Sequence, residues 1–582
     1  MSESTTEKLP RDAAAEKGMV NVQIDGNWIQ VPRGTRMIEA CRQAGKEVPH
    51  YCYHPKLSSP GNCRMCLVQM GMPPRPAPGE APAYRGDGYQ EIGWMPRPVI
   101  ACANTVAENM GIRTGGELVD LCREGVMEFL LINHPLDCPI CDQAGECSLQ
   151  EFSVEHGRGG SRFREQKVKK PKNVEIGPRI RLDDERCIMC SRCIRFMDEV
   201  ADDPVLGFVD RGTHTKLTVH PGKTLKNNYS LNTADICPVG ALTSNDFRFQ
   251  MRVWFLKETK SIDPNCGTGC NTVIWTRGNE IYRITPRENN DVNSAWMPDS
   301  HRLNFHYLHS GARLDVPMVK TGGKAHEATD WPTAVAKAAE GMSMRQPGEI
   351  AVIGSGLQTN EELFLLRRLA EALGTDLLTI VPRPQEGDDM LVSDDRCPNT
   401  TGAKLIWETE EPGAKLDAIR EGVRSRRIRT LIVFYEDLLK DAGFKAEDLA
   451  RLDVLVSNHI LPNQTAKASH VVLPGAGFAE KRGSMVNVAG RLQRLNKAIE
   501  PPRGAMDDWE IIRDLVAAVE KAAPPRHLIE DVVKELAAAI PAFDGRTLSK
   551  IGDLGVQITN TGRTVPLLER ERVRIERGEI VG

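Results

Sequence analysis

The sequence lacks the features that mark membrane-spanning and exported chains. Its 582 residues contain no run of the roughly 18 apolar residues that a helix needs to cross a bilayer. Mean hydropathy is -0.36. Residues 1–18 have no apolar core and carry four acidic side chains, which argues against a secretory signal and a transit peptide. We therefore predict that residues 1–18 are a flexible tail on a cytoplasmic protein.

An excess of charge of one sign is also missing. The 75 Lys and Arg residues nearly balance the 79 Asp and Glu residues, for a net charge of -4. This balance gives no reason to expect a nucleic-acid partner or direct binding to an anionic membrane. The basic run at residues 167–172 is short, and we interpret it as a solvated or subunit-facing linker.

Cysteine is almost absent from the second half of the chain and dense in the first. Fifteen of the 16 cysteines lie between Cys41 and Cys270, and only Cys397 follows them. A chain of this length needs no disulfides to fold, and a reducing compartment would not maintain them. Closely spaced cysteines in such a protein indicate metal binding.

The first cysteine group is Cys52, Cys63 and Cys66, joined by Cys102 after a Pro- and Gly-rich stretch. Four thiolates suit a [2Fe–2S] cluster, whose two irons need four ligands in total. Gly61 lets the backbone approach closely, so that amide N–H groups can reach the sulfurs. A structural zinc site with four cysteines is the alternative.

The second group is His134, Cys138, Cys141 and Cys147, which follows a segment of helical apolar periodicity at residues 116–132. Three thiolates and one imidazole can hold either a [4Fe–4S] cluster or a structural zinc ion. We interpret His134 as a ligand because it stands shortly before the Cys-Pro-Ile-Cys turn. A helix-end histidine whose polar atoms are already satisfied is the alternative.

The third group is Cys187, Cys190 and Cys193, followed after 43 residues by Cys237-Pro238. Bacterial ferredoxins have this run, and the Cys-Pro cysteine serves another cluster only where two clusters are present. No second triplet precedes Cys237, so we predict that it completes a single [4Fe–4S] site.

Five cysteines remain outside these groups. Cys41 and Cys122 lie at helical spacing from apolar neighbours and are predicted core residues. Cys397 stands alone and receives no role. Cys266 and Cys270 cannot hold a [4Fe–4S] cluster unaided, and we interpret them as the remnant of a lost site. Three clusters without a general acid–base group predict an electron relay with no catalytic residue of its own.

The pattern of the sequence changes near residue 260. Before it, residues 20–31 alternate around Asp25-Gly26, which predicts a β-hairpin, and Thr35 is placed to cap a short helix that Gly45 would end. After it, apolar strands alternate with amphipathic helices, the pattern of an α/β domain. The clearest of these are strands at 350–353, 430–435 and 470–474 and a helix at 360–373.

Four motifs resemble those of a known family. They are PHYCYHPKLSSPGNCRMCLVQM, INHPLDCPICDQAGECSLQE, RCIMCSRCIRF and DICPVGAL. In content and in order they resemble the large iron–sulfur subunit (the G subunit) of respiratory NADH–quinone oxidoreductase, complex I. The back half, in TNEELFLLRRLAEALGTD and HVVLPGAGFAEKRGSMVNVAGRLQ, is similar to the molybdopterin-oxidoreductase-like domain of that family.

The resemblance implies a multidomain fold of mixed α/β and α+β class. The implied domains are the flexible tail (1–18), a β-grasp [2Fe–2S] ferredoxin domain (19–103, with an insertion at 72–98), a His–Cys [4Fe–4S] segment (104–160), a [4Fe–4S] ferredoxin-like domain with one cluster (161–258), and a molybdopterin-oxidoreductase-like domain without an active molybdenum site (259–582). The implied cluster ligands are the same three groups: Cys52, Cys63, Cys66 and Cys102; His134, Cys138, Cys141 and Cys147; and Cys187, Cys190, Cys193 and Cys237.

The resemblance also implies an activity and partners. The chain would relay electrons within NADH:quinone oxidoreductase, from a flavoprotein subunit that carries FMN and the NADH site. A ferredoxin-like subunit with two [4Fe–4S] clusters would pass them towards quinone, which supports proton translocation. The chain would lie among other peripheral-arm subunits on the cytoplasmic side of the inner (plasma) membrane, bound to the membrane only through the complex. No flavin and no complete active site are expected on it, and Gly354-Ser355-Gly356 lacks the third glycine of a dinucleotide-binding loop.

The sequence departs from the family where some members carry a further [4Fe–4S] cluster, near residues 263–297 here. Asp263 and Met297 stand at or near two of the expected cysteine positions, and a carboxylate and a thioether replace thiolates poorly. We therefore predict that this fourth cluster is absent. The surroundings of Cys397 do not resemble a molybdenum-ligand loop, so no molybdenum is expected.

Three other functions stay open at this point. A molybdenum-dependent formate dehydrogenase shares the front domains but needs a molybdenum ligand in the back half. An iron-only hydrogenase needs further cysteines after residue 270, and the chain has one. A non-catalytic scaffold with structural zinc would have colourless, EPR-silent sites.

Overall fold

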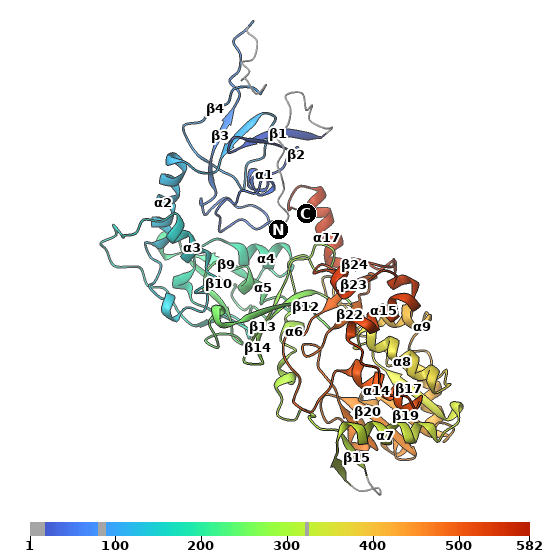
Figure 1. The fold of residues 1–582 in the computed structure, drawn as a ribbon. Coiled ribbons are helices and arrows are strands. Elements are labelled where there is room, and N and C mark those ends of the chain that lie inside the picture. The colour runs from blue at the N-terminus through green and yellow to red at the C-terminus, as the bar shows by residue number, and fades with distance from the viewer. Residues whose placement is uncertain (1–17, 80–88, 321–324, 582) are drawn as a thin grey trace. The chain divides into compact units, whose positions relative to one another are not determined.

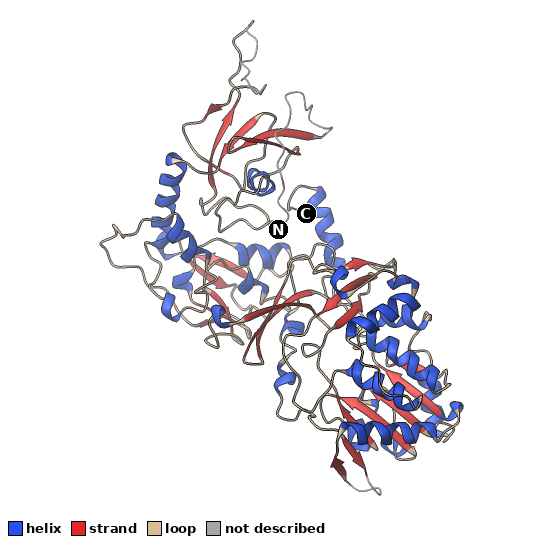
Figure 2. Ribbon diagram, viewed as in Figure 1, coloured by secondary structure: helices blue, strands red, loops and turns tan. Residues whose placement is uncertain are grey.

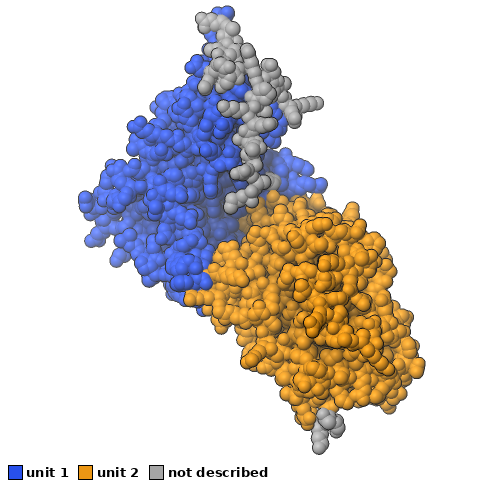
Figure 3. Space-filling model, in the orientation of Figure 1, with its two compact units in different colours: residues 1–255, 571–582 blue, residues 256–570 orange. Residues whose placement is uncertain are grey.

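The computed structural model describes residues 18–79, 89–320 and 325–581. The chain forms two compact units, one of Met1–Phe255 with Glu571–Gly582 and one of Leu256–Arg570 (Figure 3). Residues 1–17 of the predicted tail and residues 80–88 of the predicted insertion lie outside the described residues. In the described part of the chain, no helix is long and apolar enough to span a membrane.

The first unit begins with a six-stranded sheet in the order β2-β1-β6-β3-β4, with β5 paired to β3 (Figure 1). Its strands are β1 (Met19–Ile24), β2 (Asn27–Pro32), β3 (Leu67–Met72), β4 (Gly93–Trp94), β5 (Val99–Ile100) and β6 (Met110–Arg113). The predicted hairpin is confirmed, because Ile24 pairs with Asn27 across Asp25-Gly26. Helix α1 (Met37–Gln43) buries Met37, Ile38 and Cys41 in the same core.

Two details of this domain differ from the sequence prediction. Thr35 does not cap α1, because Arg36 occupies the N-cap position and the Thr35 hydroxyl donates to the carbonyl of Pro32 at 2.7 Å. The sheet also extends beyond the expected boundary at residue 103. Strand β6 pairs with both β1 and β3, and its buried Met110 and Ile112 belong to the core of the sheet.

The rest of the first unit consists of short elements that carry cysteine-bearing loops. Helix α2 (Glu117–Leu131) matches the predicted periodicity and precedes the 3-10 turn η1 (Cys138–Ile140) and α3 (Ser148–Glu155). A small sheet of β7 (Val174–Glu175), β8 (Ile180–Leu182) and β11 (Leu242–Ser244) follows, with the hairpin of β9 (Leu206–Val209) and β10 (Lys216–Val219). Cys193 of the third cysteine group lies on helix α4 (Arg192–Glu199), and Cys237 follows helix α5 (Asn232–Asp235).

The residues from Glu571 onward return to the first unit, although the sequence placed them in the C-terminal domain. They include the end of helix α17 (Pro566–Glu576). Arg574 Nη2 lies 2.6 Å from Glu199 Oε2, and the amide of Val581 donates to the carbonyl of Pro55 at 2.8 Å. Lys56 Nζ lies 3.8 Å from Glu571 Oε2, with both side chains buried. These contacts fasten the loop that follows Cys52.

The second unit is built on a seven-stranded sheet in the order β16-β15-β21-β20-β19-β17-β18, surrounded by helices (Figure 2). Five of its strands are parallel to one another: β17 (Ile350–Gly354), β18 (Leu378–Ile380), β19 (Thr430–Phe434), β20 (Val454–His459) and β21 (Val471–Pro474). Strand β15 (Met318–Lys320) pairs antiparallel with β21 and with the edge strand β16 (His326–Ala328). The main helices are α7 (Trp331–Ser343), α8 (Asn360–Ala372), α14 (Asp508–Val519) and α15 (Ile529–Ala539). Helix α8 starts as predicted because Thr359 and Glu362 form a capping box.

Two smaller sheets complete the second unit. One consists of β12 (Lys257–Ile262), β13 (Asn271–Arg277) and β14 (Glu280–Pro286), and the other of β22 (Gly483–Val486), β23 (Arg491–Leu495) and β24 (Val556–Gln557). Both the strands and the helices predicted for an α/β domain are therefore present.

Candidate metal centres

The structure brings the first cysteine group together. The Cys52 amide donates to the Cys63 sulfur at 3.4 Å. Thiol hydrogen bonds join Cys52 to Cys63, Cys52 to Cys102 and Cys66 to Cys102. Cys52, Cys66 and Cys102 are buried in the domain core. Four sulfurs linked in this way in an apolar setting fit the ligand set of a [2Fe–2S] cluster.

The loop that carries this group requires its glycine. Gly61 has φ of +63°, and a Cβ at this position would lie 2.8 Å from Ile100 Cδ1. A side chain there would therefore be both strained and crowded. The amides that reach the Cys63 sulfur are those of Cys52 and Met65.

The third group lines one small cavity. Cys187, Cys190, Cys193 and Cys237 all line it, with apolar walls that include Phe208. These donors fit a [4Fe–4S] cluster in low-dielectric surroundings.

The backbone around this cavity adopts unusual dihedral angles and directs amide groups at the cysteine sulfurs. Met189 and Ser191, between the cysteines, have φ of 56° and 61°, a conformation that non-glycine residues seldom adopt. Burial raises the pKa of Cys190 to about 12, and the positive charges of Arg192 and Arg195, together with the amide of Arg192, oppose this rise. Three amides point at Cys237, those of Val239, Ala241 and Leu242. Amide hydrogen bonds to sulfur are one of the means by which a protein tunes an iron–sulfur site.

The second group is only partly assembled. Burial raises the pKa of Cys147 to about 11, and the neighbouring thiols of Cys141 and Cys138 add to the rise. Cys138 is exposed and Cys141 is buried. Burial lowers the pKa of His134 to about 4, which leaves a neutral imidazole suited to metal binding. Within the described residues, His134 makes no hydrogen bond with these three cysteines, so its role as the fourth ligand stays a prediction.

The third group adjoins the first through two arginines, of which Arg195 is buried and Arg192 is half-buried. Arg195 Nη2 donates to the carbonyl of Cys52 at 2.5 Å, and Arg192 donates to the carbonyl of Tyr53. Asn62 also donates to the carbonyl of Met189 at 3.1 Å. The sequence analysis missed both arginines. Their spacing of three residues on a helix beside Cys193 is the signal that could have revealed them.

The third group also adjoins the second, through the segment that follows Cys237. A Cβ on Gly240 would lie 2.2 Å from the Cys141 sulfur, so only glycine permits this approach. The Cys147 sulfur lies 3.9 Å from the carbonyl oxygen of Pro238. The Cys-Pro segment therefore contacts one site through Cys237 and the other through Pro238 and Gly240.

The region of the predicted lost site is filled by protein hydrogen bonds. His301 Nδ1 lies 2.7 Å from Asp263 Oδ2, and both side chains are buried. The amide nitrogen of the Asn265 side chain donates to Asp263 Oδ1 at 2.6 Å. Cys266 and Cys270 are fully buried. An aspartate already engaged in this way does not fit a cluster ligand, and the absence of a fourth cluster here stays a prediction.

None of the three groups includes Cys41, Cys122 or Cys397. Cys41 is buried as predicted, and burial raises its pKa to about 12, while Cys122 is only half-buried. Cys397 is buried, with its sulfur near the carbonyl of Val381. In the described ranges, no three His, Cys, Asp or Glu side chains converge on a single metal ion.

Comparisons with known proteins match this arrangement domain by domain. The matching family models are a 2Fe-2S iron–sulfur cluster binding domain (17–116), the NADH-ubiquinone oxidoreductase-G iron–sulfur binding region (123–162), the ferredoxin-like domain of NADH-quinone oxidoreductase subunit 3 (177–243), the 4Fe-4S domain of NADH-ubiquinone oxidoreductase NDSU1/NuoG-like proteins (256–306) and molybdopterin oxidoreductase (420–518). The predicted fold class, with iron–sulfur domains ahead of a molybdopterin-oxidoreductase-like domain, is confirmed. The fourth match covers the segment of Asp263 and His301.

Curated relatives match part of the chain, and three of them are named as subunits of NADH-quinone or NADH-ubiquinone oxidoreductase. The G subunit of NADH-quinone oxidoreductase from Rickettsia felis is 41% identical over 62% of this chain and 50% of its own length. The NADH-ubiquinone oxidoreductase 75 kDa subunit of Reclinomonas americana is 38% identical over 69% of this chain and 54% of its own. The mitochondrial 78 kDa subunit of Neurospora crassa is 40% identical over 62% and 46%. The chain thus spans about half the length of the curated relatives it matches.

A solved structure of an NAD+-reducing [NiFe]-hydrogenase in the H2-reduced state matches more distantly, at 24% identity and a TM-score of 0.33. It covers 40% of this chain and 91% of that one. This likeness is too weak to bear on function. The cysteine groups, the order of the matched domains and the names of the relatives agree, and along the part that matches this chain is similar to the G subunit of NADH–quinone oxidoreductase.

Proposed function

We propose that this chain relays electrons in NADH:quinone oxidoreductase through one [2Fe–2S] and two [4Fe–4S] clusters. The observation that carries the proposal is the contact of the Cys187 group with both other cysteine groups within one compact unit. Iron–sulfur clusters accept and release single electrons. The chain supplies the thiolates, the amides that stabilise them and the burial that excludes water. The ligands are the three predicted groups, with His134 as the least supported member.

The likeness to the G subunit supports specific partners. A flavoprotein subunit with FMN and the NADH site would deliver electrons, and a ferredoxin-like subunit with two [4Fe–4S] clusters would carry them towards quinone. The chain would then lie in the peripheral arm, on the cytoplasmic side of the inner (plasma) membrane, and support proton translocation. A formate dehydrogenase function is not favoured, because the named relatives are NADH dehydrogenase subunits.

An exposed apolar surface around the second site is suited to such a partner. Leu136 is 89% exposed, Val154 is 82% exposed and Trp254 is 57% exposed. Val154 and Trp254 line the same hollow as Cys138 and Cys147. Apolar side chains gathered in this way mark interaction sites, and a partner that docked here would lie beside a cluster ligand.

The experiment that tests the proposal measures iron, sulfide, zinc and molybdenum in the anaerobically purified chain, together with EPR of its reduced form. One [2Fe–2S] and two [4Fe–4S] clusters require about ten irons and as many sulfides, without molybdenum. About fourteen irons would show a cluster at Cys266 and Cys270, and stoichiometric molybdenum would indicate a formate dehydrogenase. Zinc alone would refute electron transfer. The pure chain should not oxidise NADH, because no flavin is placed on it.

A further inference from the structure

One buried arginine connects the segments that carry the second and third cysteine groups. Arg186 is 3% exposed and directly precedes Cys187. Its Nε and Nη2 donate to Asp137 Oδ2 at 3.1 and 3.0 Å, and Asp137 directly precedes Cys138. A guanidinium stays protonated and accepts no hydrogen bond, so Arg186 is not a metal ligand and its role must lie elsewhere.

The same side chain reaches the segment that follows Cys237. Arg186 Nη1 donates to the carbonyl of Gly240 at 3.3 Å. Gly240 packs against the Cys141 sulfur so closely that a Cβ at this position would collide with it. One guanidinium therefore joins the beginning of the third group, the last segment of the third group and the turn of the second group.

Two carboxylates hold the charge of Arg186 in place. Its Nη1 lies 3.1 Å from Asp183 Oδ2, and the same oxygen lies 2.9 Å from Arg248 Nη2. Asp137 is also shared, because Lys172 Nζ lies 2.8 Å from its Oδ2. Hydrogen bonds between charged groups are stronger than neutral ones and fix the geometry of an arginine. Removal of Arg186 alone would make the charge between the two cysteine groups one unit more negative.

Burial makes this charge effective. Arg186 and Asp183 are both nearly inaccessible to water, and charges in such surroundings are screened less than charges at the surface. The pKa of Cys141 shows the direction of the effect: burial raises it, and the positive charge of Arg186 is the largest opposing influence. Net charge is one of the factors that set the potential of an iron–sulfur site, and a buried cation favours the more negative, reduced state.

From these contacts we propose that Arg186 is a positioning residue shared by the second and third sites. It holds the turn at residues 138–141 against the third cysteine group, and its buried charge raises the reduction potential of both sites. The inference rests on the proposed electron relay and deepens it, because it names one side chain through which two neighbouring sites are tuned together.

EPR redox titration of the full chain tests the proposal. Arg186→Gln should lower the reduction potentials of both [4Fe–4S] signals and leave the [2Fe–2S] potential unchanged. Arg186→Lys should restore most of the lost potential, because lysine keeps the charge although it cannot reproduce the fork of hydrogen bonds. Arg181→Gln is the matched control, since Arg181 is half-buried on β8 and pairs with the exposed Glu175 at 3.2 Å. It should leave all three potentials unchanged.

A variant of the partner carboxylate should give the opposite shift. Asp137→Asn removes a negative charge next to Cys138 and leaves Arg186 in the chain, so it should raise the potential of the second site. Both Arg186→Gln and Asp137→Asn break the same ion pair, so a purely structural role would change the two variants alike. Opposite shifts of potential therefore identify the charge as the cause. Iron and sulfide content shows for each variant whether the clusters are retained.

The possible outcomes separate this inference from the relay itself. Unchanged potentials in Arg186→Gln, or shifts of the same sign in Arg186→Gln and Asp137→Asn, would overturn the inference and leave the relay intact. If Arg186→Gln loses iron, near-wild-type potentials in Arg186→Lys with a raised potential in Asp137→Asn would support the inference, and any other result would overturn it. A wild-type chain that holds zinc and gives no EPR signal would refute the relay, and the inference with it.

Discussion

Replacement of Lys481 by methionine should strongly destabilise the second unit. Lys481 is 1% exposed, and its Nζ lies 2.8 Å from Glu362 Oε1 and 3.3 Å from Asp508 Oδ2, both in fully buried side chains. Methionine fills similar volume but leaves two buried carboxylates without a cation. Removal of one partner from a buried ion pair costs about 3–5 kcal/mol. For a unit of this size, such a loss lowers the melting temperature by about 5–10 °C.

Differential scanning calorimetry of the full chain measures this change. Lys404→Met, at an exposed helical position, is the control and should melt like the wild type. The double variant Lys481→Met, Glu362→Gln should recover about 1–3 kcal/mol, because it removes one of the unpaired charges. Burial raises the pKa of Glu362, and Lys481 opposes that rise. Without Lys481 the carboxyl stays protonated to higher pH, so the loss should be smaller at pH 6 than at pH 8. A single variant as stable as the wild type, or a double variant less stable than the single, would refute this reasoning.

Three further outcomes are expected. Cys190→Ser should remove or convert one [4Fe–4S] EPR signal and leave the [2Fe–2S] signal intact; loss of the [2Fe–2S] signal in a folded chain would contradict the ligand partition. Arg195→Gln should lower the reduction potential of the [2Fe–2S] site in an EPR redox titration, because a buried cation next to Cys52 favours the more negative reduced state, and an unchanged potential would exclude that influence. Asp507→Asn should stabilise the second unit. Burial raises the pKa of Asp507 from 3.8 to about 6, so its ionisation costs stability as pH rises through that range. The gain should therefore grow by about 1 kcal/mol between pH 5 and pH 8, and a constant gain would count against it.

The sequence predicted best the features that depend on local chemistry. Period-two alternation around Asp25-Gly26 gave the hairpin, and the apolar strands gave the parallel sheet, because both follow from short-range patterns. The cysteine groups were identified by spacing alone, and two of the three are assembled in the structure. Thr35 does not cap the helix, and its hydroxyl instead donates to the carbonyl of Pro32. The residue type alone does not decide between these two hydrogen bonds of a threonine side chain.

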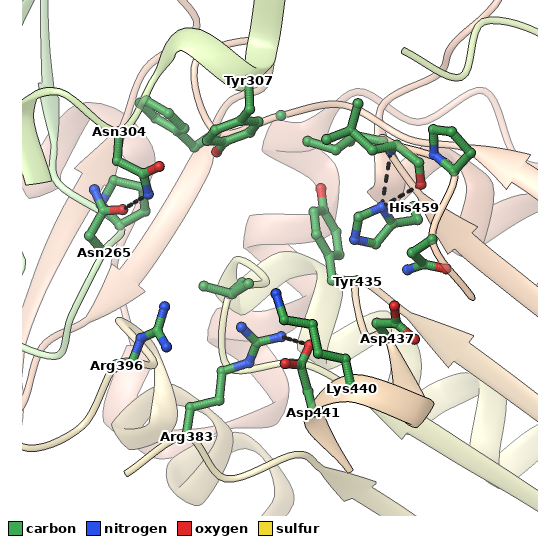
Figure 4. Close-up of a pocket in the computed structure, with 18 of the residues that line it drawn as sticks. Asn265, Asn304, Tyr307, Arg383, Arg396, Tyr435, Asp437, Lys440, Asp441 and His459 are labelled. Carbon is green, nitrogen blue, oxygen red and sulfur yellow. Dashed lines mark hydrogen bonds and ion pairs between the residues drawn. The ribbon is translucent and has the colours of Figure 1, made fainter. Parts of the chain in front are cut away.

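Features that join distant segments could not be predicted in this way. Arg195 contacts the carbonyl of Cys52 from 143 residues away, and no periodicity reports such a contact. Strand β6 completes the first sheet only because the chain returns to it after the cluster loop. One cavity of the second unit is lined by Tyr307, Arg396 and Lys440, which come from three distant segments of the chain (Figure 4), so the sequence alone does not bring them together.

The return of Glu571 and the residues after it to the first unit has a consequence for biosynthesis. Arg574 donates to the carbonyl of Lys56, a partner 518 positions earlier in the chain. At about 5–20 residues per second, a ribosome needs about 25–100 s to make the intervening chain. Throughout that interval the loop after Cys52 lacks the contacts that fasten it. Iron and sulfide can therefore be delivered to the nascent first site before the last helix closes over its neighbouring loop.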